Sequence, residues 1–492
     1  MEPRVRRVIG ALAVAAVAVL ALGVAGCGGA SEIALAPPWT SAGVTIARDV
    51  FGHNTVWSQG GLGIWNDATN MPNGDALAAI SPLSPRLLRF PGGTRAMRYH
   101  FAQAIGDTRT PECDPFRGVT DDTHYGPDEF LRIADGLGAD VSWVAPWVDG
   151  SPDESAALAQ FLAPHPSVKF LEIGNEPYLG LPTGPVSDSC GRPSQFVQDE
   201  RWVGDMRIPT TAADYAAQLA LTAPKVRAAN PSLLIGAPAT SQYDGTSDAM
   251  DAVGDVDAQL AHDPWNRRLL SDAHDAFDFF VLHPYDFTVD DDARMRLAER
   301  ARKTVRDLRA AAPDKQVAIT EYGFLFGGGT LLNAIVTADM TRMAIEEQLP
   351  LLVRHILIET EMGPFADSAA IGQGLALSPA YDALQLLSMF EDAVAFPTPD
   401  LASDGTLVAL PARKPDGSAL VLLIDRRVDD GAPRRVRVTL PSGSFDVSTP
   451  TLSGALDDRS TRADFPPSQT VSGSVTVSVP AHSVVILFAK PR

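Results

Sequence analysis

Short apolar segments alternate with amphipathic helix patterns through most of this chain, and that alternation restricts the fold more than any other feature. Each apolar segment has the length of one buried strand, and most are followed by a stretch with helical spacing. Strands that alternate with helices form parallel β/α units, so eight such units within residues 45–392 predict an α/β fold, a (β/α)8 TIM barrel. The expected strands are Thr45–Phe51, Arg86–Phe90, Asp140–Val144, Val168–Ile173, Leu233–Gly236, Phe277–Leu282, Gln316–Thr320 and His355–Ile358. The expected helices include Pro127–Leu137, Glu154–Leu162, Ala212–Ala228, Ala293–Ala311 and Leu331–Glu347.

Two connections between these units are long. Residues 91–126 and 178–210 are rich in Gly, Pro, Asp and Thr. Loops of this length in a compact domain are usually functional. We expect both to form walls of a cleft on one face of the barrel, with decorative insertion as the alternative.

The pattern changes after the helical stretch Tyr381–Phe390. Short β-patterned segments follow, separated by turn signals such as Pro415-Asp416-Gly417. Short strands at regular spacing predict an antiparallel β-sandwich, here a C-terminal domain over residues 393–492. The expected strands are Thr406–Leu410, Ala419–Ile424, Arg434–Leu440, Ser474–Val479 and Val484–Phe488.

The first residues have the pattern of a targeting segment. Three arginines precede the apolar run Val8–Val24, and small residues then lead to Cys27. This order resembles the lipobox of bacterial lipoproteins, which implies a signal peptide over residues 1–26 and a lipid on the Cys27 thiol. Residues 27–44 are then interpreted as a linker.

A lipid on Cys27 would determine where the protein is found. It would be exported and lipid-anchored to the bacterial cell membrane, facing the extracellular or periplasmic side. An ordinary signal peptide or an uncleaved anchor helix would account for the same residues.

The charge of the chain restricts its partners. With 60 acidic and 40 basic side chains, the formal net charge is −20. Such a surface repels polyanions, so we expect no nucleic-acid partner.

Cysteine usage leaves one question open. If Cys27 is acylated, Cys113 and Cys190 remain, and both lie in the loops expected on one barrel face. An exported protein permits a disulfide between them. Two free thiols are the alternative.

Two of the expected strands end directly on a glutamate. Val168–Ile173 leads into Gly174-Asn175-Glu176-Pro177, and Gln316–Thr320 leads into Glu321. Pro177 excludes the α conformation at the preceding residue, so that strand ends in a fixed turn. Barrel enzymes keep their chemistry at the C-terminal ends of the strands. Two carboxylates there predict cleavage of a glycosidic bond, which needs one acid and one nucleophile or base.

Motifs for other chemistries are missing from the sequence. No Lys-Ser/Thr follows Gly327-Gly328-Gly329, so this run is not a phosphate loop. The histidines lack metal-binding spacing, and no Gly-x-Ser-x-Gly elbow is present. The sequence therefore predicts neither a metal nor another cofactor, and it disfavours an esterase.

Four motifs resemble those of clan A glycoside hydrolases. Gly174–Pro177 looks like their acid/base motif, and Ile319–Gly323 looks like their nucleophile strand. His283-Pro284-Tyr285 is similar to the clan's His-x-Tyr, and Arg89 before a Pro-Gly-Gly turn is similar to the arginine that ends strand two. The resemblance runs through the C-terminal sandwich and implies a retaining O-glycoside hydrolase acting by double displacement.

The resemblance also implies a role for each residue. Glu176 would be the general acid and then the base, and Glu321 would be the nucleophile, with the carboxyls about 5–5.5 Å apart. Arg89 would hold the charge of Glu321 in place, Tyr285 would donate a hydrogen bond to Glu321, and His283 would help set the proton balance. The alternatives are a core histidine, simple packing of Tyr285 and a surface salt bridge of Arg89.

Further side chains are candidates for contact with a sugar or support of the site. Asn175 offers both a donor and an acceptor to a sugar hydroxyl. Trp143 and Trp147 flank the end of the third expected strand, where one of them stacks on a sugar or both pack in the core. We take Trp147 as the substrate-binding candidate. Glu172, inside a strand, is expected in a buried polar network.

The end of the eighth expected strand departs from the clan. Many members place a tryptophan there, whereas this chain has Glu359 and Glu361 near that point. The substrate is therefore a weaker expectation than the reaction. We expect an exo-acting enzyme similar to α-L-arabinofuranosidases, with β-glucuronidase of the heparanase type or β-xylosidase as alternatives. A non-catalytic glycan-binding surface lipoprotein and a structural or adhesion protein are the alternatives of another class.

Overall fold

A parallel eight-stranded barrel forms the larger part of the computed structural model, which describes residues 32–114, 119–147, 150–178, 200–203, 206–209, 211–240, 264–286, 288–324, 328–359 and 369–492. Neighbouring strands in the barrel are also successive along the chain, and the last strand lies beside the first. A bridge between Ile319 and Leu352 joins the two ends of the sheet. The strands are β3 (Gly52–Asn54), β6 (Leu87–Phe90), β9 (Asp140–Ala145), β10 (Val168–Ile173), β13 (Leu234–Pro238), β14 (Phe279–Leu282), β16 (Gln316–Ile319) and β18 (Val353–Arg354).

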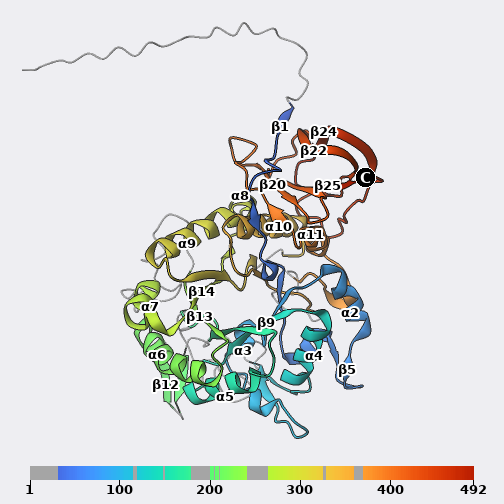
Figure 1. Cartoon of the computed structure of the whole chain (residues 1–492). Coiled ribbons are helices and arrows are strands. Elements are labelled where there is room, and N and C mark those ends of the chain that lie inside the picture. Colours follow the sequence, from blue (N-terminus) through green and yellow to red (C-terminus); the bar gives the residue numbers. More distant parts are fainter. Residues whose placement is uncertain are drawn as a thin grey trace, which may run out of the picture. The chain divides into compact units, whose positions relative to one another are not determined.

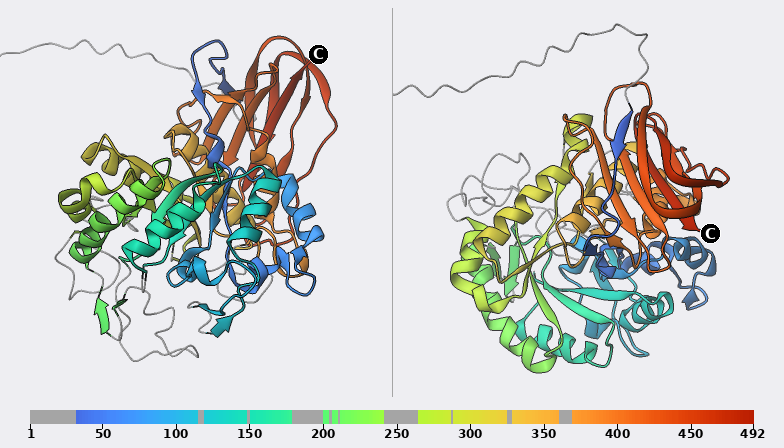
Figure 2. Two further views of the ribbon diagram at one scale, coloured as in Figure 1. Left: turned by 60° about the horizontal axis from the view of Figure 1, so that its bottom comes forward. Right: turned by 45° about the horizontal axis from the view of Figure 1, so that its top comes forward.

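Helices surround this ring of strands, as Figure 1 and the right-hand view of Figure 2 show. Local signals set their ends. At the start of α5, the Ser151 hydroxyl accepts from the backbone N–H of Glu154, and α4 ends at Gly138, whose φ of +65° suits a residue without Cβ. The main helices are α4 (Pro127–Leu137), α5 (Pro152–Leu162), α6 (Ala212–Ala229), α7 (Trp265–Ala273), α9 (Leu297–Ala311) and α10 (Leu331–Glu346). Shorter ones are α1 (Ser58–Gly63), α2 (Gly74–Ile80), α3 (Gly93–Ala96), α8 (Asp291–Met295) and α11 (Pro379–Ser388).

The barrel confirms the expected fold class, but two expected strands are wrong. The segment Thr45–Phe51 is not the first barrel strand, because Thr45 pairs outside the barrel and Arg48–Val50 forms a 3-10 helix. The first barrel strand follows it as β3. The last strand, β18, lies before the expected His355–Ile358, because its pairing with β3 stops at Arg354.

A second sheet, mostly antiparallel, follows the barrel and encloses its own apolar core. This confirms the strand-rich C-terminal part, drawn in orange to red in Figure 1. The central strands lie in the order β22, β25, β21, β20, β19. These elements are β19 (Val394–Ala395), β20 (Leu407–Arg413), β21 (Ala419–Asp425), β22 (Arg434–Ser448), β23 (Thr451–Ser453), β24 (Gln469–Val479) and β25 (Ser483–Pro491).

The segment preceding the barrel belongs to this second sheet. Strand β1 (Ile33–Leu35) pairs in parallel with β22, and β2 (Val44–Thr45) pairs antiparallel with β19. Between them, the Trp39 indole N–H donates to the carbonyl of Thr439 at 2.8 Å. Residues 33–45 therefore supply strands and core to the sandwich, where the sequence suggested a linker.

The sandwich also holds the barrel helix α10. In a loop of the sandwich, residues 454–464, the carbonyl of Asp458 accepts from the N–H of Leu331, and the carbonyl of Leu456 accepts from the N–H of Leu332. The first N–H groups of a helix have no partner inside the helix, so this loop caps α10. We call residues 454–464 the capping loop.

Buried ion pairs fasten the same helix from its side. Arg426, at the end of β21, lies 2.8 Å from Asp339 of α10 and 2.8 Å from Glu299 of α9. Asp339 is 1% exposed and pairs also with Arg342. Removal of one partner would leave a buried charge unpaired, so barrel and sandwich depend on each other.

Within the described residues, no helix combines the length and the apolar character needed to cross a bilayer. The apolar run Val8–Val24 and Cys27 lie outside the described residues.

Candidate active site

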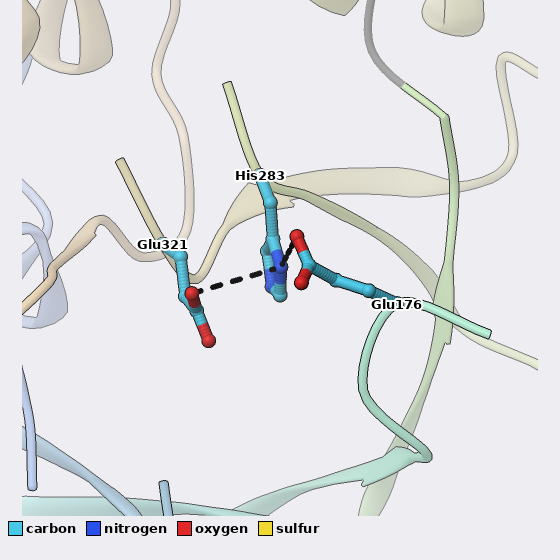
Figure 3. A group of neighbouring side chains, drawn as sticks. All are labelled: Glu176, His283 and Glu321. Carbon is cyan, nitrogen blue, oxygen red and sulfur yellow. Dashed lines mark ion pairs between the residues drawn. The ribbon is translucent and has the colours of Figure 1, made fainter. Parts of the chain in front are cut away.

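Two glutamates and a histidine meet at the C-terminal end of the barrel. Glu176 follows β10, His283 follows β14 and Glu321 follows β16. Figure 3 shows the imidazole ring of His283 between the two carboxyl groups. One ligand atom from each of the three side chains lies within 4.8 Å of the others. A carboxylate separation of this size is typical of retaining glycosidases, because inverting enzymes leave about 6.5–9.5 Å for a water molecule.

Arg89 is the centre of the polar network beneath these groups. Its side chain is completely buried, and its guanidinium donates to two carboxylates, Glu172 at 2.8 Å and Glu321 at 2.6 Å. It also donates to the side-chain oxygens of Asn54 at 3.1 Å and Asn175 at 3.0 Å. Burial disfavours its charge, but the two carboxylates outweigh burial and raise the pKa of Arg89. The expected contact with Glu321 is present, and a surface salt bridge is excluded.

Glu321 is held as a buried anion. Besides Arg89, it accepts a hydrogen bond from the Tyr285 hydroxyl at 2.7 Å, as expected. Burial raises the pKa of Glu321, whereas the Arg89 guanidinium and the hydrogen bond from the Tyr285 hydroxyl lower it, and the balance lies below the usual value of a glutamate. The carboxylate is therefore ionised across the range in which proteins normally work.

The backbone at Gly93 lies so close to the Glu321 carboxylate that a side chain at position 93 would collide with it. A Cβ placed on Gly93, the first residue of α3, would lie 2.7 Å from Glu321 Oε1. Because Gly93 has no Cβ, the turn after β6 can approach the Glu321 carboxylate closely.

Glu176 has a different environment. Its side chain is 13% exposed and its Oε1 lies 3.0 Å from His283 Nδ1. The Tyr178 hydroxyl lies 3.5 Å from the same oxygen, and Asn175 Nδ2 donates to the other oxygen at 3.4 Å. Its φ of +44° is rare for a residue with a side chain and marks a strained turn before Pro177. Among the described residues, no arginine or lysine contacts Glu176 in the way that Arg89 contacts Glu321.

His283 connects the two glutamates to the buried network. Its Nε2 lies 2.9 Å from the Thr320 hydroxyl, which donates to Glu172 at 3.1 Å. Glu172 also accepts from the Ser142 hydroxyl at 2.7 Å. Glu172 thus belongs to a buried polar network, as the sequence suggested. His283 is buried, and the partners described for it, Glu176, Glu321 and Thr320, are side chains of the site.

The two candidate tryptophans, Trp143 and Trp147, are both buried. Trp147 is 2% exposed, and its ring lies 4.6 Å from that of Tyr215. Trp143 is 1% exposed and packs on Phe90 and Phe130. Neither ring presents an open face, so the packing alternative describes them and Trp147 is corrected from a sugar platform to a core residue.

Sequence reasoning missed two residues of the site. Nothing in the sequence assigned a role to Asn54, yet its amide joins Arg89 to the carbonyl of Thr320. His355 was expected inside a strand, yet its Nδ1 lies 3.8 Å from Glu321 Oε2. Burial lowers the pKa of His355 to about 4 against the opposing effect of Glu321, so the ring is neutral near pH 7. Asn54 ends β3 and His355 follows β18. Their positions at the ends of barrel strands are the sequence signal that could have identified them as site residues.

The site residues include the candidates for a bound cation. Within the described residues, Glu176, His283 and Glu321 form the group that could hold a metal ion, and these are the same residues that suit a glycosidase. Cys27, Cys190 and the side chain of Cys113 lie outside what the structure describes.

Comparisons with known proteins agree with this fold. No family model matches the chain. A probable α-L-arabinofuranosidase C of Aspergillus fumigatus is 28% identical over 89 residues, so the match spans only 18% of this chain and 18% of that relative.

Solved structures match over nearly the whole chain. An α-L-arabinofuranosidase from Thermotoga maritima has a TM-score of 0.70 at 18% identity, covering 93% of this chain and 99% of its own. A xyloglucanase from Paenibacillus polymyxa has a TM-score of 0.63 at 11% identity, covering 94% and 100%. The chain therefore has the barrel-and-sandwich fold found in these glycoside hydrolases.

Proposed function

We propose that this protein is a retaining glycoside hydrolase that uses Glu321 as nucleophile and Glu176 as acid and base. The observation that carries the proposal is the pair of carboxylates within 4.8 Å at the C-terminal end of the barrel, of which one is ion-paired with Arg89 and the other is not. A pair with such unequal surroundings is what two opposite proton roles require.

The first step transfers the glycosyl group to the protein. A Glu321 oxygen attacks the anomeric carbon, the bond from that carbon to the leaving oxygen breaks, and Glu176 gives its proton to that oxygen. Tyr285 and Arg89 donate to Glu321 and hold the attacking carboxylate in one orientation. The product is a glycosyl ester of Glu321.

The second step reverses these roles. Glu176, now a carboxylate, takes a proton from water, and the water oxygen attacks the anomeric carbon as the ester bond to Glu321 breaks. Two inversions give retention of configuration. Both glutamates return to their starting protonation.

The substrate belongs to the same proposal at a finer level. We propose that the substrate is an α-L-arabinofuranoside from which the enzyme removes the terminal sugar by exo-action. The arabinofuranosidases among the similar proteins support this substrate. β-Glucuronide and β-xyloside substrates remain the alternatives. Export and a lipid on Cys27 are likewise proposed from the N-terminal sequence alone.

A panel of aryl glycosides tests the reaction. We would incubate the protein with the α-L-arabinofuranoside, β-D-xyloside, β-D-glucuronide, β-D-glucoside and β-D-galactoside, beside Glu176→Ala and Glu321→Ala. Release from one substrate, lost in both variants and kept in Asp153→Ala, would support the proposal and identify the sugar. Asp153 is a matched control because its carboxylate is 85% exposed. Glycan binding without release from any glycoside or polysaccharide would overturn it in favour of a binding protein.

A further inference from the structure

The hydroxyl of Thr320 lies between the carboxylate of Glu172 and the imidazole ring of His283. Thr320 is completely buried. Its Oγ1 donates to Glu172 Oε2 at 3.1 Å and lies 2.9 Å from His283 Nε2. Its backbone is fixed as well, since its N–H donates to Leu282 and its carbonyl accepts from Asn54. Its two contacts therefore place the hydroxyl between Glu172 and His283.

Glu172 decides the direction of the first hydrogen bond. Its carboxylate is completely buried, pairs with Arg89 at 2.8 Å and accepts from the Ser142 hydroxyl at 2.7 Å. An ionised carboxylate has no hydrogen to give. The single hydrogen of the Thr320 hydroxyl therefore belongs to the bond with Glu172.

The second hydrogen bond must then run the other way. With its hydrogen committed, Thr320 Oγ1 offers only lone pairs to His283, so His283 Nε2 carries a hydrogen and donates it. In the neutral ring the other nitrogen, Nδ1, then has the lone pair. Nδ1 lies 3.0 Å from Glu176 Oε1 and 4.0 Å from Glu321 Oε2.

We infer that Thr320 and Glu172 are positioning residues that fix the Nε2–H tautomer of His283 and thereby keep a transferable proton on Glu176. A neutral ring of this tautomer accepts at Nδ1, so the close contact with Glu176 favours the carboxylic acid over the carboxylate. The inference rests on the proposed function for its catalytic meaning, but the tautomer itself does not depend on turnover. The groups that face His283 are Glu176 after β10, Glu321 and Thr320 at the end of β16, and, one contact further away, Glu172, Arg89, Tyr285 and His355.

We call the hydrogen bonds from His283 through Thr320 to Glu172 the relay. The first catalytic step needs the relay only for some substrates. A poor leaving group must receive a proton as its bond to the sugar breaks, whereas a strongly acidic phenol leaves without one. Loss of the relay should therefore slow poor leaving groups and spare good ones. A merely structural defect would slow both.

The direct test is the tautomer of His283. We would record long-range ¹H–¹⁵N spectra of histidine-labelled protein at pH 7 and assign His283 from the signals lost in His283→Gln. The expected result is a hydrogen on Nε2 and a bare Nδ1 in the unmodified protein, and loss of that preference in Thr320→Val, which has nearly the same shape without the hydroxyl. A hydrogen on Nδ1 in the unmodified protein, or an unchanged tautomer in Thr320→Val, would overturn the inference.

The kinetic test uses the glycoside found with the aryl panel. In Thr320→Val, a ring free to place its hydrogen on Nδ1 would donate to the Glu176 carboxylate and favour loss of the acid proton. The basic limb of the kcat/KM profile should therefore move to lower pH by about one unit, the effect of a hydrogen bond of ordinary strength. The rate with a nitrophenyl leaving group of low pKa should change less than threefold, and that with an alkyl leaving group should fall about tenfold.

Two variants separate the relay from packing and folding. Thr320→Ser keeps the hydroxyl and should restore both the tautomer and the basic limb. Ser142→Ala removes another donor to Glu172 at the same depth but leaves Thr320 in place, so the tautomer should remain. If Thr320→Val does not fold, Ser142→Ala, Thr320→Ser and the unmodified protein still decide the tautomer. If no glycoside is cleaved but the tautomer is as expected, the proposed function fails and the relay stands.

Discussion

Individual residues in this site are distinguished by what surrounds them and not by their type. Glu172, Glu176 and Glu321 carry the same carboxyl group. Two of them pair with Arg89 and the third contacts His283. An opposite charge within a few ångströms favours ionisation, so Arg89 selects which carboxylates stay charged.

Replacement of Arg89 tests this selection. Arg89→Met would leave the charges of Glu172 and Glu321 without a cation. We expect the free energy of unfolding to fall by about 3–5 kcal/mol and kcat/KM to fall at least about 100-fold. Urea unfolding and kinetics on the identified glycoside measure both.

A second variant separates the two effects. Arg89→Met combined with Glu172→Gln removes one unpaired charge and should recover part of the stability. Activity should stay low, because Glu321 still lacks its cation. Recovered activity would show that Arg89 acts through Glu172 and not on Glu321.

Asp49, at the opposite end of the barrel, predicts a pH effect on stability. Burial, opposed by Lys169 and helped by Asp140, raises the pKa of Asp49 from 3.8 to about 7. A raised carboxyl pKa means that the folded protein binds this proton more tightly than the unfolded chain, so stability falls as pH rises from about 4 to 7. Asp49→Asn should therefore raise the free energy of unfolding at pH 8 by about 1–2 kcal/mol, with little change at pH 4. Urea titrations at both pH values measure it, and an equal gain at both would contradict this explanation.

At the scale of elements, the capping loop joins the sandwich to α10, the helix that follows β16. Asp458 shapes this loop, because its carboxylate accepts from the backbone N–H and hydroxyl of Ser460 and from the hydroxyl of Thr461. The carbonyl of the same residue caps Leu331 of α10. A side chain of the sandwich therefore influences the start of a barrel helix.

Hydrogen exchange tests that influence. Asp458→Ala should speed exchange of the Leu331 and Leu332 amides, because their acceptors in the loop lose their fixed position. Asp457→Ala is a matched control, since Asp457 is an exposed neighbour in the same loop. Mass spectrometry of a peptide over residues 328–336 gives the readout. Equal exchange in the two variants would show that the loop keeps its shape without the Asp458 side chain.

Elements with strong local signals could be predicted from sequence. The expected helix Pro127–Leu137 agrees with α4 because Pro127 starts it and Gly138 ends it. Val168–Ile173 agrees with β10 because it is a continuous buried run. The motifs around Glu176 and Glu321 likewise lie at strand ends, so their meeting followed from the barrel.

Elements that depend on partners distant in the sequence could not be predicted. Thr45 was predicted to start a barrel strand, because nothing nearby in the sequence shows that it pairs with Val394. The roles of Asn54 and Thr320 depend on side chains from three other strands. Trp147 was misjudged because sequence does not show which way a ring at a strand end points.

At the scale of the whole molecule, the boundary near residue 393 does not mark a point where the chain can be cut. The sandwich contains β1 and β2 from the start of the chain, and the barrel helix α10 takes its cap from residues 456 and 458. Asp339 of α10 would also lose its sandwich partner, Arg426. The two parts therefore form one cooperative unit.

Truncation tests this cooperation. A fragment of residues 46–392 should lack a cooperative thermal transition and near-ultraviolet circular dichroism, because it leaves α10 uncapped and Asp339 short of a cation. The full chain measured beside it should show one transition. A cooperative melt of the fragment would show that the barrel folds independently of the sandwich.

Strand β1 has a consequence for the order in which the molecule is made. Its partner β22 lies about four hundred residues later in the chain, as does the carbonyl that receives the Trp39 indole N–H. A ribosome must therefore add about four hundred residues after β1 before β22 exists. Strand β1 therefore stays without its partner while all eight barrel strands are synthesised, so the second sheet cannot form until the barrel sequence has been made.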